Sequence, residues 1–188
     1  MKNLFIFDFD DTLAHSEIPV FVKMKNGERV RLTSKEFAKY NLSPGDLFDF
    51  SEFNKIIKTA IPIEKHVNML RDALSKPNNK VTILTARALA YPVSYWLRTM
   101  VGLSPYVVAV GGSNPNLKKD YIEKEIKKGF KNVFFIDDSV PNIMAVDTLK
   151  EKYPDVNIIT KVADKHNLNE SEKRLEQLIK REIKKMLF

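Results

Sequence analysis

The sequence contains no cysteine, only three histidines and no long apolar run, and each of these absences excludes a class of site. Without cysteine, neither disulfides nor thiolate metal ligands are available, which fits a reducing cytoplasm. His15, His66 and His166 are scattered and show no metal-ligand spacing. No apolar run approaches the roughly 20 residues of a membrane-spanning helix, and Met1-Lys2 leads into a strand-like run without a signal peptide. We therefore expect a cytoplasmic protein that does not enter a membrane.

Length and charge narrow the choice of architecture and partners. The chain has 188 residues, of which 44% are apolar and 29% charged, enough for one domain with a buried core and a small insert. Its formal net charge is +7 and its pI is about 9.4, a balance that favours a polyanionic partner such as nucleic acid. A lysine-rich surface without such a partner explains the same charge, so both interpretations stay open.

Short apolar runs alternate with helical patterns along the chain. The runs with the composition of buried strands are residues 4–7, 81–84, 107–110, 133–136 and 157–160. The segments with helical periodicity are residues 63–74, 91–100, 117–128 and 143–152. This alternation predicts an α/β fold, with a Rossmann-like parallel sheet flanked by helices. Right-handed crossovers would then bring the carboxyl ends of the strands to one edge of the sheet.

The region between the first two strands interrupts this alternation. An Asn-Gly pair at 26–27 lies between two β-prone runs, which predicts a hairpin at 17–33. A capping signature over 33–36 predicts a short helix after it. We expect the aromatic residues of 47–57 to pack this insert onto the main domain, with base stacking as the alternative. The sequence therefore predicts a small hairpin-plus-helix cap insert at about 14–62.

The last segment is a second candidate contact surface. Residues 169–188 place apolar side chains on one helical face and lysines and arginines on the opposite face. A helix docked on the sheet domain is the first expectation, and a basic helix that contacts a partner or RNA is the second. We accordingly divide the chain into a core at 1–165, which carries the insert, and a C-terminal amphipathic helix at 166–188.

Three carboxylates, Asp8, Asp10 and Asp11, follow directly on the first strand in the stretch LFIFDFDDTLA. Charge at the end of a core strand is costly unless it is paired or metal-bound, and ligands bind at this edge of parallel sheets. Asp8 and Asp10, two apart on an extended chain, would project to the same side. One could attack a substrate while the other transfers protons, with a divalent cation reducing their repulsion. An acidic turn that caps a helix is the alternative.

Other segments bring complementary groups to the same edge. Thr85 follows the strand at 81–84, Asp137 and Asp138 follow the strand at 133–136, and Lys118 lies early in a helix. A carboxylate nucleophile can form an acyl phosphate, and Mg²⁺ takes oxygen ligands together with a substrate phosphate. A hydroxyl and an ammonium group can hold the non-bridging oxygens. The set is typical of phosphoryl transfer.

Four motifs, in the order FDFDDTL, ILTAR, the Lys118-Lys119-Asp120 segment and FFIDDS, resemble the signature motifs of the haloacid dehalogenase (HAD) phosphohydrolase superfamily. The resemblance covers residues 3–146. It implies a Mg²⁺-dependent phosphatase, a phosphoric monoester hydrolase that works through an aspartyl-phosphate intermediate. A dehalogenase of this superfamily lacks the second aspartate of the first motif, so phosphate hydrolysis is favoured.

The resemblance also implies a role for each motif residue. Asp8 would be the nucleophile. Asp10 would protonate the leaving group and then activate the water that cleaves the phosphoenzyme. Thr85, Ala86 and Lys118 would bind the phosphoryl group, and Lys118 would also orient Asp8.

The metal ligands implied by the resemblance are Asp8, Asp10 through its backbone carbonyl, Asp137 and Asp138. We assign Asp138 as the direct ligand and Asp137 as a second one, direct or through water. Lys119 competes with Lys118 for the lysine role, and we prefer Lys118 because it lies four residues before the inward-facing Ile122. The sequence departs from the family at Asp11, where a glycine is common.

An insert as small as 14–62 would leave the cleft open, and open members of the superfamily act on macromolecules, including the ends of polynucleotides. The FIDDS stretch and the lysine-rich third motif are similar to those of polynucleotide phosphatase domains, and the insert is similar to that of uncharacterised phage-encoded members. The expected substrate is a nucleotide or the terminal phosphate of a polynucleotide, with the lysines of 117–128 as candidate phosphate contacts. The alternative is a catalytically idle HAD-fold module that binds nucleic acid, although no motif acid is missing here.

Overall fold

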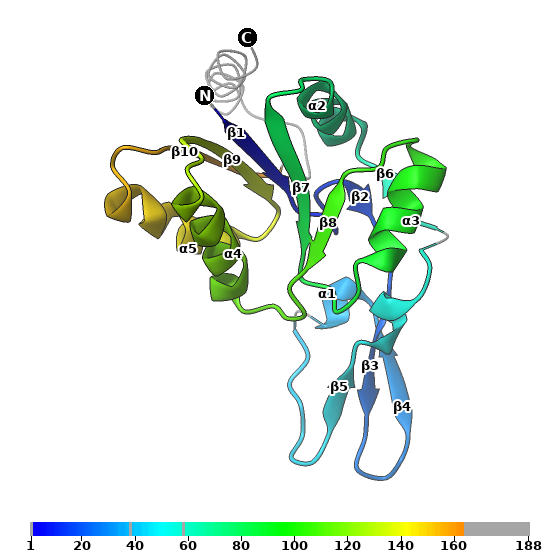
Figure 1. Cartoon of the computed structure of the whole chain (residues 1–188). Coiled ribbons are helices and arrows are strands. Elements are labelled where there is room, and N and C mark those ends of the chain that lie inside the picture. The colour runs from blue at the N-terminus through cyan, green and yellow to red at the C-terminus, as the bar shows by residue number, and fades with distance from the viewer. Residues whose placement is uncertain (1, 38, 58, 164–188) are drawn as a thin grey trace, which may run out of the picture.

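Five parallel strands form the central sheet of the protein, in a computed structural model that describes residues 2–37, 39–57 and 59–163 (Figure 1). Across the sheet, the strands are β10 (Asn157–Val162), β9 (Asn132–Asp137), β1 (Asn3–Phe7), β7 (Asn79–Thr85) and β8 (Tyr106–Ala109). Each apolar run that we expected to be a strand forms one, and the predicted α/β fold with a parallel sheet is confirmed. The C-terminal helix expected at 166–188 lies outside the described residues.

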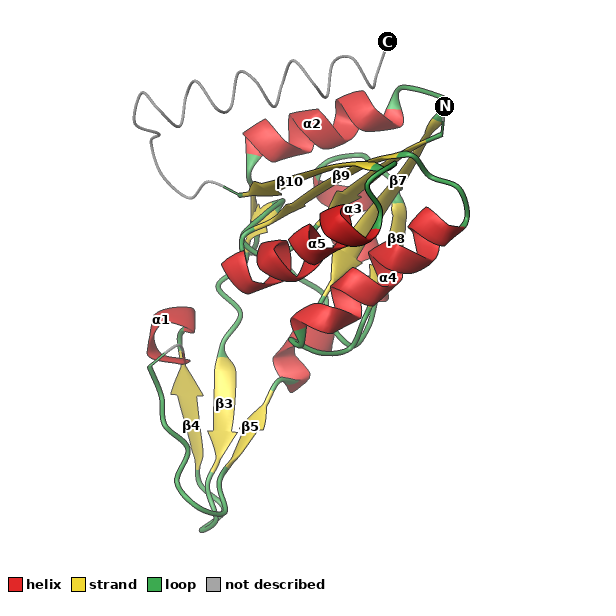
Figure 2. Ribbon diagram, turned by 90° about the vertical axis from the view of Figure 1, so that its left-hand side faces the viewer, coloured by secondary structure: helices red, strands yellow, loops and turns green. Residues whose placement is uncertain are grey.

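Helices cover both faces of this sheet, as Figure 2 shows. They are α2 (Glu64–Leu74), α3 (Tyr91–Met100), α4 (Pro115–Lys127) and α5 (Val140–Lys152). Because side chains alternate along a strand, β1 contributes to two apolar cores. Phe5 and Phe7 pack with residues of α2 and α3, while Leu4 and Ile6 pack with residues of α4 and α5. Within the described part of the chain, no helix is both long and apolar enough to cross a membrane.

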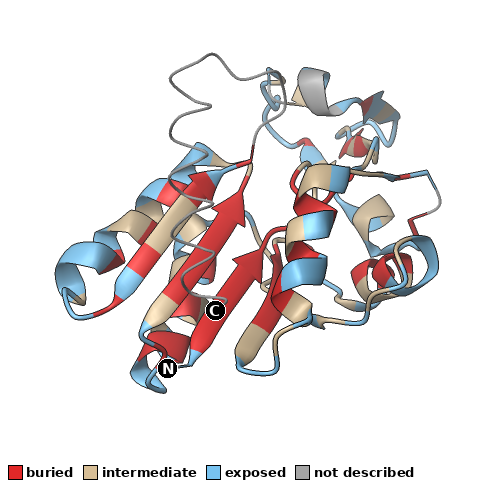
Figure 3. Cartoon of the chain, turned by 90° about the horizontal axis from the view of Figure 1, so that it is seen from above, coloured by how far each residue is buried: buried red, intermediate tan, exposed pale blue. Residues whose placement is uncertain are grey.

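The three inner strands, β1, β7 and β9, are buried along most of their length, whereas the edge strands β8 and β10 are partly exposed (Figure 3). Burial of each large apolar side chain stabilises the fold by about 1.5–3 kcal/mol. All five residues of β1 are buried, since β1 has a strand on each side and helices over both faces. The first strand is therefore a rigid base for the acidic segment that follows it.

The insert between β1 and α2 has a sheet of its own. Its ends pair with each other, because β2 (Ala14–His15) runs antiparallel to β6 (Ile61–Pro62). Between them, β4 (Arg29–Leu32), β3 (Val20–Lys23) and β5 (Leu47–Asp49) form an antiparallel sheet. This sheet projects away from the core in both Figure 1 and Figure 2. The predicted hairpin is β3 and β4, whereas β5 was not expected from the sequence.

Two short helical turns complete the insert: α1 (Ser34–Phe37) and the 3₁₀ helix η1 (Ser51–Asn54). The expected capping signature is present at α1. The Glu36 amide donates to the Thr33 hydroxyl at 3.3 Å, and the Thr33 amide donates back to the Glu36 carboxylate at 2.7 Å. This reciprocal pair satisfies amide donors that the start of a helix would otherwise leave without partners.

Five rings pack on one another in the insert, with centroids 4.9–6.3 Å apart. This insert aromatic cluster consists of Phe37, Tyr40, Phe48, Phe50 and Phe53. Phe53 also contacts the main domain, since its ring centroid lies 5.1 Å from the guanidinium carbon of Arg87. The cluster therefore stabilises mainly the insert itself, and Phe53 makes the expected contact with the core.

Candidate functional site

The acidic segment after β1 lies between the ends of β7 and β9. β1 pairs with both strands, with Phe7 opposite Ile83 on one side and Ile136 on the other. The amide of Asp8 donates to the carbonyl of Ile136 at 2.9 Å, which continues the pairing for one residue. The topology therefore places Asp8 directly beside the Asp137-Asp138 pair that ends β9.

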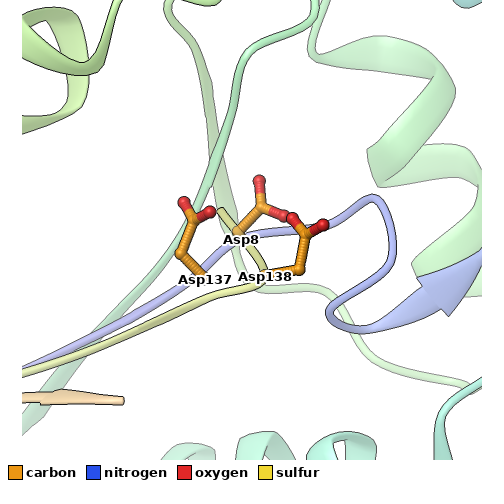
Figure 4. Close-up of side chains that lie close together, drawn as sticks. All are labelled: Asp8, Asp137 and Asp138. Atoms are coloured by element: carbon orange, nitrogen blue, oxygen red, sulfur yellow. The ribbon is translucent and has the colours of Figure 1, made fainter. Parts of the chain in front are cut away.

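Three carboxylates meet at this point (Figure 4). Asp8, Asp137 and Asp138 each offer an oxygen, and these oxygens all lie within 4.8 Å of one another. Asp8 and Asp137 are buried and Asp138 is half-buried. Three carboxylates this close repel one another, and a divalent cation with oxygen ligands would relieve that repulsion. The group, which we call the carboxylate cluster, could hold a metal ion.

Lys118 supplies a positive charge to the carboxylate cluster. It lies in the first turns of α4, which begins after Asn114, whose side chain accepts from the Asn116 amide at 3.0 Å. The buried ammonium group donates to Asp8 at 2.6 Å and to Asp137 at 2.7 Å. Lys118, and not Lys119, is thus the lysine that lies between the acids.

Burial and neighbouring charges together set the protonation of Lys118 and Asp8. Burial lowers the pKa of Lys118, but the carboxylates of Asp8 and Asp137 outweigh it and raise that pKa above its ordinary value, so the ammonium stays charged. Burial raises the pKa of Asp8 to about 7, opposed by Lys118 and reinforced by Asp137 and Asp10. A bound cation would favour the ionised carboxylate that a nucleophile needs.

Asp137 is engaged on both of its oxygens. Besides Lys118, it accepts from the Ser139 amide at 2.8 Å, and the Asn142 amide group lies 3.0 Å from both oxygens. Asn142 lies in the first turns of α5, and sequence reasoning did not identify it, since no motif marks it. These contacts orient Asp137 toward Lys118, and the assignment of Asp138 as the direct metal ligand stays a prediction.

Asp10 lies apart from the carboxylate cluster. Its carboxylate accepts from Arg87 Nε at 2.8 Å and Nη2 at 2.6 Å, and from the Ser16 hydroxyl at 2.5 Å. Arg87 and Ser16 were not predicted as site residues, although Arg87 belongs to the ILTAR motif. The expected metal contact of Asp10 runs through its backbone carbonyl and stays a prediction.

Thr85 and Ala86 lie at the same edge, because β7 pairs with β1. Thr85 is the last residue of β7 and is buried, and its hydroxyl accepts from the Arg87 amide at 3.3 Å. Ala86 follows and is half-buried. Their predicted contact with a phosphoryl group stays a prediction.

Asp11 adopts a backbone conformation that is typical of glycine. Its φ is 55°, in the left-handed region that glycine adopts most readily and aspartate tolerates. The Asp11 carboxylate lies 3.1 Å from His15 Nδ1. The tight turn after β1 thus keeps the conformation that a glycine would take.

Comparisons with known proteins add nothing to this geometry. No protein-family model matches the chain, and neither the curated proteins nor the solved structures contain a match. The interpretation of the site therefore rests on the residues themselves.

Proposed function

We propose that the chain is a Mg²⁺-dependent phosphohydrolase of the HAD type, which acts through an aspartyl phosphate formed on Asp8. The observation that carries the proposal is the set of groups around Asp8. The side chain is buried, bound by the ammonium of Lys118 at 2.6 Å and grouped with Asp137 and Asp138 within 4.8 Å. A buried carboxylate beside one fixed cation and two further acids suits attack on an anionic phosphate.

The reaction would proceed in two steps. Asp8 attacks the phosphorus, the bond from phosphorus to the ester oxygen breaks, and Asp10 gives its proton to the departing oxygen. Asp10 then takes a proton from water, the water oxygen attacks the phosphorus, and the bond to Asp8 breaks to release inorganic phosphate. Lys118 offsets the negative charge beside Asp8 in both steps.

The carboxylate cluster fits Mg²⁺ by its chemistry, since Mg²⁺ takes carboxylate oxygens together with water and substrate phosphate. Asp8 and Asp138 would hold the ion directly. Asp137, already bound by Lys118 and Asn142, would orient the lysine and complete the charge balance. When bound, the ion would neutralise charge on the phosphoryl oxygens.

We further propose a nucleotide or the terminal phosphate of a polynucleotide as substrate. Phe50 of the insert aromatic cluster is 48% exposed and packs against Phe53, whose ring contacts Arg87. This exposed ring is linked to Asp10 through three contacts, by way of Phe53 and Arg87, and could stack on a base whose phosphate lies at Asp8.

The lysine at the end of the 117–128 segment, Lys128, does not support this substrate. Lys128 pairs with Glu125, which also binds Lys80 near the start of β7. This contact places them near the amino ends of the strands, opposite the site.

The proposal is tested by phosphate release from nucleotides, sugar phosphates and 3′- or 5′-phosphorylated oligonucleotides, with Mg²⁺ and with a chelator. We expect hydrolysis that requires the metal and is lost in Asp8→Asn, which is nearly isosteric but cannot form the phosphoenzyme. Asp72→Asn, at an exposed position of α2 outside the four motifs, is the matched control. Full activity in Asp8→Asn would refute the aspartyl-phosphate mechanism. No hydrolysis of any ester by the wild-type chain would refute the phosphohydrolase and favour the idle binding module.

A further inference from the structure

Arg87 connects Asp10 to the insert. Its side chain is 1% exposed. Nε and Nη2 bind the two oxygens of Asp10 at 2.8 and 2.6 Å, while Nη1 donates to the backbone carbonyl of Phe53 at 2.9 Å. The guanidinium carbon also lies 5.4 Å from the ring centroid of Phe9 and 5.1 Å from that of Phe53. One buried cation thus touches the segment after β1, the end of β7 and the insert.

The chemistry of arginine suits this position. A guanidinium is planar, stays charged, and presents donors in a fixed fork. Two donors on one side match the carboxylate of Asp10, and a donor on the other side reaches the Phe53 carbonyl. A lysine ammonium is a point charge that cannot hold a carboxylate through two parallel bonds.

The backbone of Arg87 is fixed independently of the insert. Its amide donates to Thr85 Oγ1 at 3.3 Å, and its carbonyl accepts from the Gly111 amide, which follows β8, at 3.0 Å. The movable parts are therefore the side chain and its acceptors. Asp10 is also held by Ser16, near the start of the insert, so the insert contacts this carboxylate directly through Ser16 and indirectly through Phe53 and Arg87.

We propose that Arg87 is a positioning residue for proton transfer by Asp10, and that the insert holds Arg87 in place through the Phe53 carbonyl. This inference rests on the proposed phosphatase function. If the insert moved, Nη1 would lose its acceptor, and the fork that aligns the Asp10 carboxylate would loosen. The position of the insert would then control how well the leaving group is protonated.

The kinetic test compares two esters in the wild-type chain, Arg87→Ala and Arg87→Lys. A nucleoside 5′-monophosphate has an alkoxide leaving group that needs a proton, whereas p-nitrophenyl phosphate has one that needs it far less. Arg87→Ala should lower kcat about 10²-fold on the nucleotide, little on the nitrophenyl ester, and leave both KM values nearly unchanged. Arg87→Lys should be intermediate, and added guanidinium ion should restore part of the activity of Arg87→Ala.

Two comparisons separate positioning from a general loss of structure. Asp10→Asn should show the same dependence on the leaving group, and the double variant should be no slower than Asp10→Asn, because both changes remove one function. Arg98→Ala, at an exposed position of α3 over the Tyr95 ring, should behave as wild type. Equal losses on both esters, or additive losses in the double variant, would overturn the positioning role.

Amide hydrogen exchange tests the link to the insert without any substrate. The amides of Phe53 and Lys55 donate within the η1 turn to Phe50 and Glu52. They should exchange faster in Arg87→Ala and in Asp10→Asn but not in Arg98→Ala. Unchanged exchange would overturn the link. If the wild-type chain hydrolysed neither ester, the phosphatase proposal would fail together with the proton-transfer role, and the exchange rates would still decide whether Arg87 fastens the insert.

Discussion

Lys118 stabilises the fold as well as the site, because it is buried between two acids. Lys118→Met would leave Asp8 and Asp137 facing each other without a cation. Removing one partner of a buried ion pair costs about 3–5 kcal/mol, so the free energy of unfolding should fall by about that amount in the absence of metal. Urea unfolding at neutral pH with a chelator measures it.

Lys119→Met is the matched control, since the same change at the neighbouring position removes no contact with the acids. It should alter the free energy of unfolding by less than about 0.5 kcal/mol. Equal effects of the two substitutions would mean that Lys118 does not balance the carboxylate cluster.

At the scale of elements, Glu123 joins α4 to α5. Its carboxylate accepts from Lys152 at 2.9 Å, from the Tyr153 hydroxyl at 2.7 Å and from Lys127 at 2.9 Å. These contacts lower the pKa of Glu123 to about 2, and the hydrogen bond from Lys152 has the largest effect. An ionised side chain therefore joins α4 and α5 in addition to their apolar packing.

The pH dependence of stability follows from this pKa. Because the pKa of Glu123 is lower in the folded chain than its ordinary 4.5, its contribution is fully present above about pH 4.5 and is lost as the pH falls toward 2. Glu123→Gln should be less stable than wild type at pH 7, with a difference that shrinks between pH 4.5 and 2. Thermal unfolding across this range measures it, and a constant difference would contradict the assignment.

The exposed ring of Phe50 in the insert leads to a separate prediction about substrate choice. Phe50→Ala should raise KM for a nucleotide about 10-fold, as expected for loss of one stacked ring, and should leave a small phosphate ester unaffected. Leu47→Ala, at an exposed apolar position of β5, is the control. Equal changes of KM for both substrates would remove the stacking role of Phe50.

For the whole molecule, the carboxylate cluster couples metal binding to folding. Mg²⁺ at about 100 times its dissociation constant should stabilise the chain by about 2.7 kcal/mol, a rise in Tm of about 5–10 °C for this length. Asp138→Asn should abolish most of the rise. Asp137→Asn should lower the metal-free Tm, because it breaks the contact with Lys118.

Differential scanning calorimetry with Mg²⁺ and with a chelator separates these outcomes. If Asp137→Asn abolished the rise in Tm and Asp138→Asn kept it, the roles of the two acids would be exchanged. If Mg²⁺ left the Tm of the wild-type chain unchanged, the carboxylate cluster would not be a magnesium site.

The net positive charge of the chain would favour a polynucleotide over a small ester, and the dependence of KM on salt distinguishes the two. Each phosphate contact with a lysine or arginine releases counterions, so affinity falls with salt by about 0.7 logarithmic units per contact per decade for a single strand. An oligonucleotide 3′-phosphate should therefore show a steeper dependence of KM on salt than a mononucleotide. Equal slopes would restrict the substrate to nucleotides and other small esters.

Local signals in the sequence determined most of the elements. Apolar runs of four residues, helical periodicity, the Asn-Gly turn and the Thr33–Glu36 cap depend on neighbours in the chain, and the structure contains each of them. β5 was missed because it is only three residues long and forms through pairing with β3 across more than twenty positions of sequence. Pairing at that distance leaves no local periodicity to detect.

The contacts of the site were decided by tertiary structure. Neighbouring residues of a helix point about 100° apart, and the helical spacing to Ile122 already favoured Lys118 over Lys119. Only the packing of α4 against the sheet brings that face of the helix to Asp8. Arg87 meets Asp10 across 77 positions of sequence, through two strands that lie side by side. The sequence by itself determined which acids end the strands. The partners of these acids, which are Lys118, Arg87 and Asn142, were decided by the order of the strands and by the face that each helix turns to the sheet. Both arise only when the chain packs.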